Sequence, residues 1–259
     1  LLLATRLARG DRTRAKQRPQ DLAALRGSIQ ETGQMIGRQQ SAAANGQDVC
    51  GFEMVRRFVD EQCKPNEALV GETDSVPQEI VEGMKELGLF GISIPEDFGG
   101  LGLNMEEEAL VALELGQTSP AFRSVAGTNI GIGSQGLVMW GNDEQKSEWL
   151  PKIASGEIIT SFCLTEPEAG SDAGSVKTKA VRDGDHYILN GTKRYITNAN
   201  KADLLTVMAR TDPDTPGGKG LSAFLVETST PGVSIGAPEK KMGQQGAHVC
   251  PSFCTLETA

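Results

Sequence analysis

The chain has 259 residues, enough for one large domain or two ordinary ones, and its 38% of hydrophobic residues can form a core. Its 25 Lys and Arg against 34 Asp and Glu give a net charge of -9, so the chain as a whole does not attract nucleic acid or an anionic membrane. No apolar run approaches the length of a membrane span, and we expect neither nucleic acid nor membrane among the partners.

Residues 1–48 are rich in Arg, Gln, Ala and Gly and have no sustained apolar period, which predicts a weakly ordered arm. The apolar residues at its start precede the charges, the reverse of a secretory signal. The five cysteines are odd in number and form no CxxC, which argues against a disulfide framework and favours a reducing compartment. His248, Cys250 and Cys254 match no standard zinc spacing, so we expect no metal site.

Residues 49–158 have helical spacing and predict an α-helical domain. The stretch VPQEIVEGMKELGLFG places Ile80 and Met84 on one stripe, with Pro77 suited to a first turn and Gly88 to a stop. FEMVRRFVDEQ and MEEEALVALELG repeat the pattern, and NDEQKSEWLPKIASGE opens on an Asn or Asp cap. SPAFRSVAGTNIGIGSQGLVMWG predicts one helix diluted by small residues.

Residues 159–259 change to short β-rich runs and predict a mainly β domain. VKTKAVRDGDHYILNGTKRYITNAN contains DG and NG, both turn signals between strands. DLLTVMAR and LSAFLVET predict further strands, separated by the loop TDPDTPGGKG. No alternation of strands and helices appears and no Walker loop is present, so Rossmann and P-loop sites are disfavoured. The fold class is α+β, with a cleft between the domains as the natural ligand site.

The run FCLTEPEAGSD predicts a corner where a strand ends and the chain turns out of the sheet. A strand over residues 158–164 would end at Thr165 and Glu166, and Pro167 would force the chain out of the sheet. Amides and hydroxyls exposed at such a corner can bind a polar ring edge or a phosphate. From spacing alone, a plain strand-to-turn junction is the favoured interpretation, with Glu166 and Asp172 capping turns and amides rather than acting as catalytic acids.

CLTEPEAGSDAGS (residues 163–175), followed by KRYITNA (residues 193–199), resembles the paired middle-domain signature of the acyl-CoA dehydrogenases. GMKELGLFGISIPEDFGGLG, DEQKSEWLPKIASGE and EKKMGQQG are similar to further family segments in the same order. The resemblance implies a helical N-terminal domain and a middle β-barrel or sandwich-like domain. We expect the family's C-terminal helical bundle to be absent from this sequence and the middle domain to be truncated at its end.

The resemblance also implies an FAD against the two quoted runs. Phe162, Leu164 and Thr165 would lie beside the isoalloxazine, while Gly170 and Ser171 would follow the cofactor and the substrate's pantetheine. In the second run Tyr195 would stack on the ring system, and Thr197, on the same strand face, would donate near its reacting nitrogen. Ile196 lies between them and is included among the flavin-binding residues. Without the resemblance, core packing in ordinary strands would be the favoured explanation of Phe162, Leu164, Tyr195 and Thr197.

The implied function is α,β-desaturation of an acyl-CoA thioester with hydride transfer to flavin, followed by electron transfer to an electron-transfer flavoprotein. The family's glutamate base lies in the C-terminal domain, so no residue before Ala259 is assigned a catalytic role, and we expect this fragment to be inactive alone. A non-catalytic flavin- or acyl-CoA-binding or interaction module with the same fold is the alternative. A tetrameric full-length parent and a cytoplasmic location, or the mitochondrial matrix in a eukaryote, complete the expectations.

Overall fold

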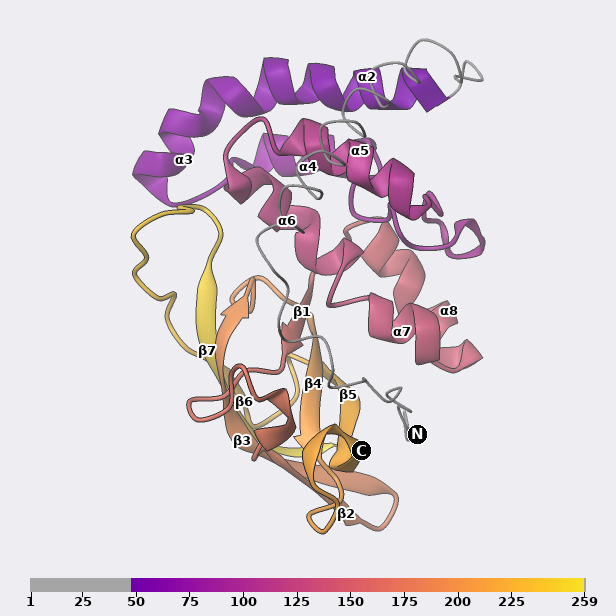
Figure 1. Ribbon diagram of the computed structural model, residues 1–259, viewed down its shortest axis with the longest axis vertical. Coiled ribbons are helices and arrows are strands. Elements are labelled where there is room, and N and C mark those ends of the chain that lie inside the picture. The colour runs from indigo at the N-terminus through magenta and orange to yellow at the C-terminus, as the bar shows by residue number, and fades with distance from the viewer. Residues whose placement is uncertain (1–47, 259) are drawn as a thin grey trace, which may run out of the picture.

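The computed structural model describes the backbone of residues 48–258 and the side chains of residues 52–252. Helices occupy one half of this part of the chain and strands the other (Figure 1). The predicted arm at residues 1–48 lies outside it except for its last residue. Within residues 48–258, none of the helices combines the length and apolar character required to span a bilayer.

The helical half begins with α2. Its helices are α2 (Asp48–Phe58), α3 (Glu67–Thr73), α4 (Gln78–Glu86), α5 (Met105–Leu115), α6 (Pro120–Ile130), α7 (Gln135–Trp140) and α8 (Asp143–Ala154). A π-helical turn, Val59–Cys63, and a 3-10 turn, Lys64–Asn66, join α2 to α3. Helices α5 and α8 each begin with a reciprocal capping box, formed by Asn104 with Glu107 and by Asn142 with Gln145.

The apolar stripes of these helices form one core. Ile80 and Met84 of α4 are fully buried, as predicted, and pack in a cluster with Val59 and with Phe122 of α6. Pro77 precedes the first turn of α4, and Gly88 adopts a φ of 69°, a conformation that a glycine takes without a steric penalty. The helical spacing of the sequence therefore identified the buried faces.

The predicted single helix over residues 119–141 is wrong, because the chain breaks between α6 and α7. Helix α6 ends at Ile130, and the backbone of the next residue, Gly131 (φ -118°, ψ -115°), is not helical. A Cβ on Gly133 would lie 2.2 Å from the Thr160 hydroxyl oxygen, so the absence of a side chain lets the first strand pack directly on this break. The small residues of the segment thus permit close approach of the sheet rather than a continuous helix.

Seven strands form the second half of residues 48–258. They are β1 (Thr160–Cys163), β2 (Lys179–Asp183), β3 (His186–Thr197), β4 (Leu204–Arg210), β5 (Leu221–Glu227), β6 (Val233–Ile235) and β7 (Val249–Thr258). The sheet order is β1-β4-β2-β3-β7-β6, with β5 also paired to β4. Strand β1 runs parallel to β4, whereas β3 pairs antiparallel with both β2 and β7. The sheet curls around a core that includes Leu189, Leu205 and Val207 (Figure 1).

One of the two turns predicted in this half is wrong. The DG pair forms the turn between β2 and β3, with Gly184 at a φ of 61°. The NG pair, Asn190–Gly191, instead lies inside β3, which continues to Thr197. A Cβ on Gly191 would lie 2.7 Å from the Cα of Thr178, so this glycine serves a close backbone approach.

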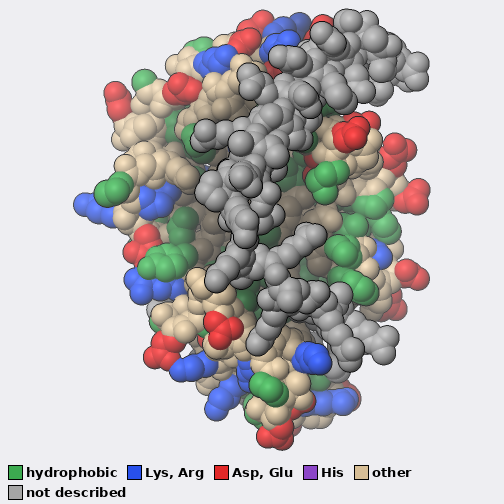
Figure 2. Space-filling model, in the orientation of Figure 1, with side chains coloured by type: hydrophobic (Ala, Val, Ile, Leu, Met, Phe, Trp, Pro, Cys, Tyr) green, Lys and Arg blue, Asp and Glu red, His purple; other side chains and the backbone are tan. Residues whose placement is uncertain are grey.

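The structure changes from helices to strands between Ala154 and Thr160. The domain boundaries expected at 48/49 and 158/159 stay predictions. On the face shown in Figure 2, basic and acidic side chains are interspersed over both halves.

Candidate functional site

The corner after β1 is built by hydrogen bonds around a tight turn. The Glu166 N–H donates to the Ala169 carbonyl at 2.9 Å, and the two residues form an isolated bridge across Pro167. Asp172 then accepts from the Gly174 amide at 3.2 Å and from the Ser175 hydroxyl at 2.5 Å, so that it caps a short 3-10 turn. The turn is therefore formed by a backbone bridge and by the Asp172 side chain, which has the capping role predicted for it.

The corner lies directly against the second predicted run. The backbone N–H of Arg194 donates to the Thr165 carbonyl at 2.8 Å. The Ser161 hydroxyl donates to the carbonyl of Thr197, and the Lys193 ammonium donates to the Leu164 carbonyl at 3.1 Å. Two segments about thirty residues apart in sequence thus lie side by side along one edge.

A buried ion pair lies behind this edge. Glu166 is 6% exposed and Lys193 is 1% exposed, and the Lys193 ammonium nitrogen lies 2.8 Å from a Glu166 carboxylate oxygen. The carboxylate also accepts from the amides of Lys177 and Thr178 and from the Thr178 hydroxyl. Burial by itself would raise the pKa of Glu166, but the hydrogen bonds from Lys193 and Thr178 hold that pKa below its usual range.

Strand β3 has a bulge immediately after Lys193. The pairing with β7 shifts between Lys193 and Ile196, so that Arg194 and Tyr195 together oppose one residue of the partner strand. Tyr195 has a φ of 59° and is 56% exposed, and the Arg194 guanidinium carbon lies 4.8 Å from the centre of its ring. In a regular strand, exposed and buried side chains alternate. The bulge instead leaves Arg194 and Tyr195 both exposed and turns the Tyr195 ring outward.

The predicted flavin-binding residues differ in accessibility. Gly170, Ser171 and Tyr195 are exposed. The half-buried ones are Phe162, Leu164, Thr165 and Thr197. Ile196 is 1% exposed, and its side chain packs in the core of the sheet.

Lys193 and Asn198 lie within KRYITNA, but no role was predicted for either residue. Asn198 is 3% exposed with a φ of 60°, and its amide donates to the Ser124 carbonyl and the Thr128 hydroxyl of α6. A lysine inside a predicted strand and an asparagine at the end of that strand were the available signals. Neither signal predicts which residues form hydrogen bonds with Lys193 and Asn198, because those residues are distant in sequence.

The corner is also tied to the helical half. The Asn129 amide of α6 donates to the carbonyls of Ile153 and Ile158, and its oxygen accepts from the Thr160 N–H at 2.8 Å. The first residue of β1 is therefore anchored to two helices before the strand reaches the corner.

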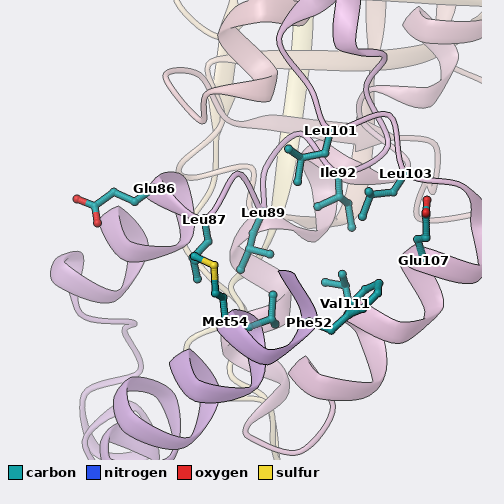
Figure 3. A pocket seen from close by; sticks show the side chains of 11 residues that line it. Phe52, Met54, Glu86, Leu87, Leu89, Ile92, Leu101, Leu103, Glu107 and Val111 are labelled. Carbon is teal, nitrogen blue, oxygen red and sulfur yellow. The ribbon is translucent and has the colours of Figure 1, made fainter. Parts of the chain in front are cut away.

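A cavity of about 280 Å³ lies elsewhere, within the helical half (Figure 3). Its walls are mainly apolar and come from α2, α4, α5 and the loop before α5, and the Glu86 carboxylate points away from it. The residues that line the cavity all precede residue 112, so it contains none of the predicted flavin-binding residues.

Comparison with known proteins gives two adjacent family matches. Residues 52–157 match the acyl-CoA dehydrogenase N-terminal domain, and residues 161–255 match the acyl-CoA dehydrogenase middle domain.

Individual relatives agree with these matches. An acyl-CoA dehydrogenase from Bacillus subtilis is 38% identical over 196 residues, which are 76% of this chain and 52% of that protein. A (2S)-methylsuccinyl-CoA dehydrogenase from Cereibacter sphaeroides is 43% identical over 68% of this chain and 32% of its own length. A glutaryl-CoA dehydrogenase from Mycobacterium smegmatis, solved in complex with FADH2, superposes with a TM-score of 0.75 at 33% identity, over 83% of this chain and 54% of that one.

The chain spans about half the length of the Bacillus protein and a smaller share of the Cereibacter one. Three observations point to the same family: the helices followed by a curled sheet, the two runs that meet at the corner, and both domain matches. The chain belongs to the acyl-CoA dehydrogenase family.

Proposed function

We propose that this chain is the N-terminal and middle part of an FAD-dependent acyl-CoA dehydrogenase, an oxidoreductase that desaturates an acyl-CoA thioester between its α and β carbons. The observation that carries the proposal is the 2.8 Å hydrogen bond from the Arg194 amide to the Thr165 carbonyl. It joins the two runs that the family uses against its flavin.

The residues at this edge suit a flavin by their chemistry. Tyr195 offers an exposed aromatic face for stacking, and Thr165 and Thr197 offer hydroxyl groups for a polar ring edge. Gly170 has open space where a Cβ would stand, so its backbone is accessible to a phosphate-bearing or pantetheine chain. The relative from Mycobacterium smegmatis, solved with FADH2, supports FAD as the form of the flavin.

FAD, when bound, would accept a hydride from the β carbon of the substrate. The residues of this chain would bind FAD and the substrate and orient them. Tyr195 and the corner backbone would fix the ring system, and Ser171 would bind the substrate's pantetheine. The three acids at the corner are already engaged. Glu166 is in the buried ion pair, Asp172 caps its turn, and Glu168 pairs with Lys177 on the surface. The proposal therefore takes the base that removes the α-proton from another part of the full enzyme.

The partners follow from the same proposal. An acyl-CoA is the substrate and an electron-transfer flavoprotein the electron acceptor, and the full-length parent is a tetramer in the cytoplasm or, in a eukaryote, the mitochondrial matrix. The alternative, a non-catalytic binding module, would keep the flavin or acyl-CoA site without turnover.

The test is a titration of the purified chain with FAD, followed by flavin absorbance before and after a medium-chain acyl-CoA is added without oxygen. Tyr195→Ala is compared with Tyr195→Trp, which keeps an aromatic face, and with Trp140→Ala, which removes an exposed aromatic ring from α7. We expect Tyr195→Ala to weaken FAD binding about tenfold and the other two variants to bind as the parent does.

Flavin bands that shift on binding but do not bleach with acyl-CoA support a binding edge that lacks the base. Bleaching shows that these 259 residues contain a base and contradicts our assignment of none. Failure of FAD to bind, or equal binding by all variants, contradicts the proposed edge.

A further inference from the structure

Glu166 and Lys193 form an unusual ion pair for this protein. Among the ion pairs of the described residues, it is the one in which both side chains are buried, with 5% and 1% of their side-chain surface exposed. Another lysine close to the corner, Lys177, pairs with Glu168 through side chains that are both 70% exposed. Burial removes both charges of the first pair from water, which is unfavourable unless further hydrogen bonds satisfy them.

Those further bonds reach three separate segments. The Glu166 carboxylate accepts from the Lys177 amide at 2.6 Å, from the Thr178 amide at 2.9 Å and from the Thr178 hydroxyl at 2.5 Å. The Lys193 ammonium adds the bond to the Leu164 carbonyl. One carboxylate and one ammonium therefore join the end of β1, the approach to β2 and the middle of β3.

The position of Lys193 in β3 gives this junction a second consequence. Lys193 is the last residue before the bulge, and the next residue, Arg194, donates its amide to Thr165. Consecutive residues of β3 thus contact consecutive residues of the corner, Lys193 with Leu164 and Arg194 with Thr165. The pair fixes which residues of the two segments lie opposite each other, and so where the Tyr195 ring leaves the sheet.

Stability alone is a weak reason for such a pair, because apolar residues of similar volume serve a core as well or better. A geometric role explains the charges, since they select one arrangement of three segments. We infer that Glu166 and Lys193 are positioning residues for the flavin edge: they hold the backbone of Leu164–Thr165 in register with the bulge that presents Tyr195. This inference rests on the proposed function, because the edge is the one assigned to FAD.

The test compares Lys193→Met, Lys193→Arg and the control Lys177→Met in the full chain. Lys193→Met removes the charge at similar length, and Lys193→Arg keeps it. Lys177→Met breaks the exposed pair near the same corner but leaves the Lys177 amide bond to Glu166 intact. Three measurements are made: urea stability, hydrogen exchange of the Arg194 amide without cofactor, and FAD affinity with the shape of the bound flavin absorption bands.

We expect Lys193→Met to speed exchange of the Arg194 amide relative to amides in the core of β4, to weaken FAD binding by about 100-fold, and to alter the bands of the flavin that still binds. Lys193→Arg should restore part of the affinity and the parental band shape. Lys177→Met should match the parent in all three measurements.

A merely structural pair gives a different result. If Lys193→Met lowers urea stability while Arg194 exchange, FAD affinity and band shape stay parental, the inference is wrong. If Lys193→Met does not fold, Lys193→Arg decides, since parental Arg194 exchange and band shape in that variant support the inference and altered ones overturn it. If the parent itself binds no FAD, the proposed function fails, and the exchange of Arg194 still decides whether the pair sets the register.

Discussion

The side-chain amide of Asn198 donates a hydrogen bond to the Ser124 carbonyl across 2.7 Å, although 74 residues separate them in the chain. The same amide donates to the Thr128 hydroxyl at 3.0 Å. Asn198 follows the last residue of β3, and both acceptors lie in α6. This single side chain thus fastens the end of the strand that bears Tyr195 to the helical half.

Replacement of Asn198 should separate its two roles. Asn198→Gly loses the hydrogen bonds but keeps the positive φ of 60°, and we expect it to lower the free energy of unfolding by about 2 kcal/mol. Asn198→Ala adds the strain of a left-handed alanine and should lose about 1 kcal/mol more. Urea unfolding measures both, with the exposed Asn190→Ala as the control that stays close to the parent. Equal stability of Asn198→Ala and the parent would show that the contact contributes nothing.

A pair of glycines near the same helix provides a second test. A Cβ on Gly133 would lie 2.2 Å from the Thr160 hydroxyl oxygen, whereas a Cβ on Gly136 of α7 would have no atom within 4 Å. Gly133→Ala should therefore destabilise the fold by about 2 kcal/mol through overpacking. Gly136→Ala should stabilise it by about 0.5 kcal/mol, because alanine favours a helix. The difference in urea midpoint measures the effect, and two variants of equal stability would contradict the close packing of β1 on Gly133.

These glycines also show which parts of the fold the sequence could predict. Local signals, such as the apolar stripe through Ile80 and Met84, are complete within one turn or two of helix and identified the elements. Gly131, Gly133 and Gly191 looked like a diluted helix and a turn, yet two of them serve the close approach of a distant segment. A glycine in a sequence does not state which segment will approach it.

The site was predictable to the same extent. The chemistry of the corner and the aromatic run were recognisable from their residues, and the turn-capping role of Asp172 is confirmed. The ion pair between Glu166 and Lys193 was not predicted, since it depends on how the corner after β1 lies against β3, next to a bulge that alternation does not anticipate.

The pH dependence of stability should depend on Glu166. Its folded pKa lies below the ordinary value of 4.5, although burial opposes that direction, because Lys193 and Thr178 hydrogen-bond the charged form. A lowered folded pKa adds stability above the ordinary value, and this stability is lost as pH falls from 4.5 through the folded pKa. We expect Glu166→Gln to be less stable than the parent by about 3 kcal/mol at neutral pH, where it leaves Lys193 buried without its counter-charge.

The measurement is the urea midpoint of parent and Glu166→Gln from neutral pH into the acid range. The difference in urea midpoint between parent and Glu166→Gln should narrow as the pH falls below 4.5, the ordinary pKa of a glutamate, because the parent then loses the ionised carboxylate that the variant lacks. Glu168→Gln, which removes an exposed carboxylate at the same corner, should follow the parent closely. A gap between parent and Glu166→Gln that stays constant across the range would show that ionisation of Glu166 does not contribute.

Cys63 should be inert in the folded protein. It is fully buried at the end of the π-helical turn, and burial, reinforced by the nearby Glu67 carboxylate, raises the pKa of its thiol to about 12. Alkylating reagents attack the thiolate, which is scarce at neutral pH and enclosed here by core residues. We expect mass spectrometry after brief iodoacetamide treatment to find Cys63 unmodified in the native protein and modified in urea. Ser171→Cys at the exposed corner provides the positive control, and modification of Cys63 at the rate of that control would contradict the burial described for the core.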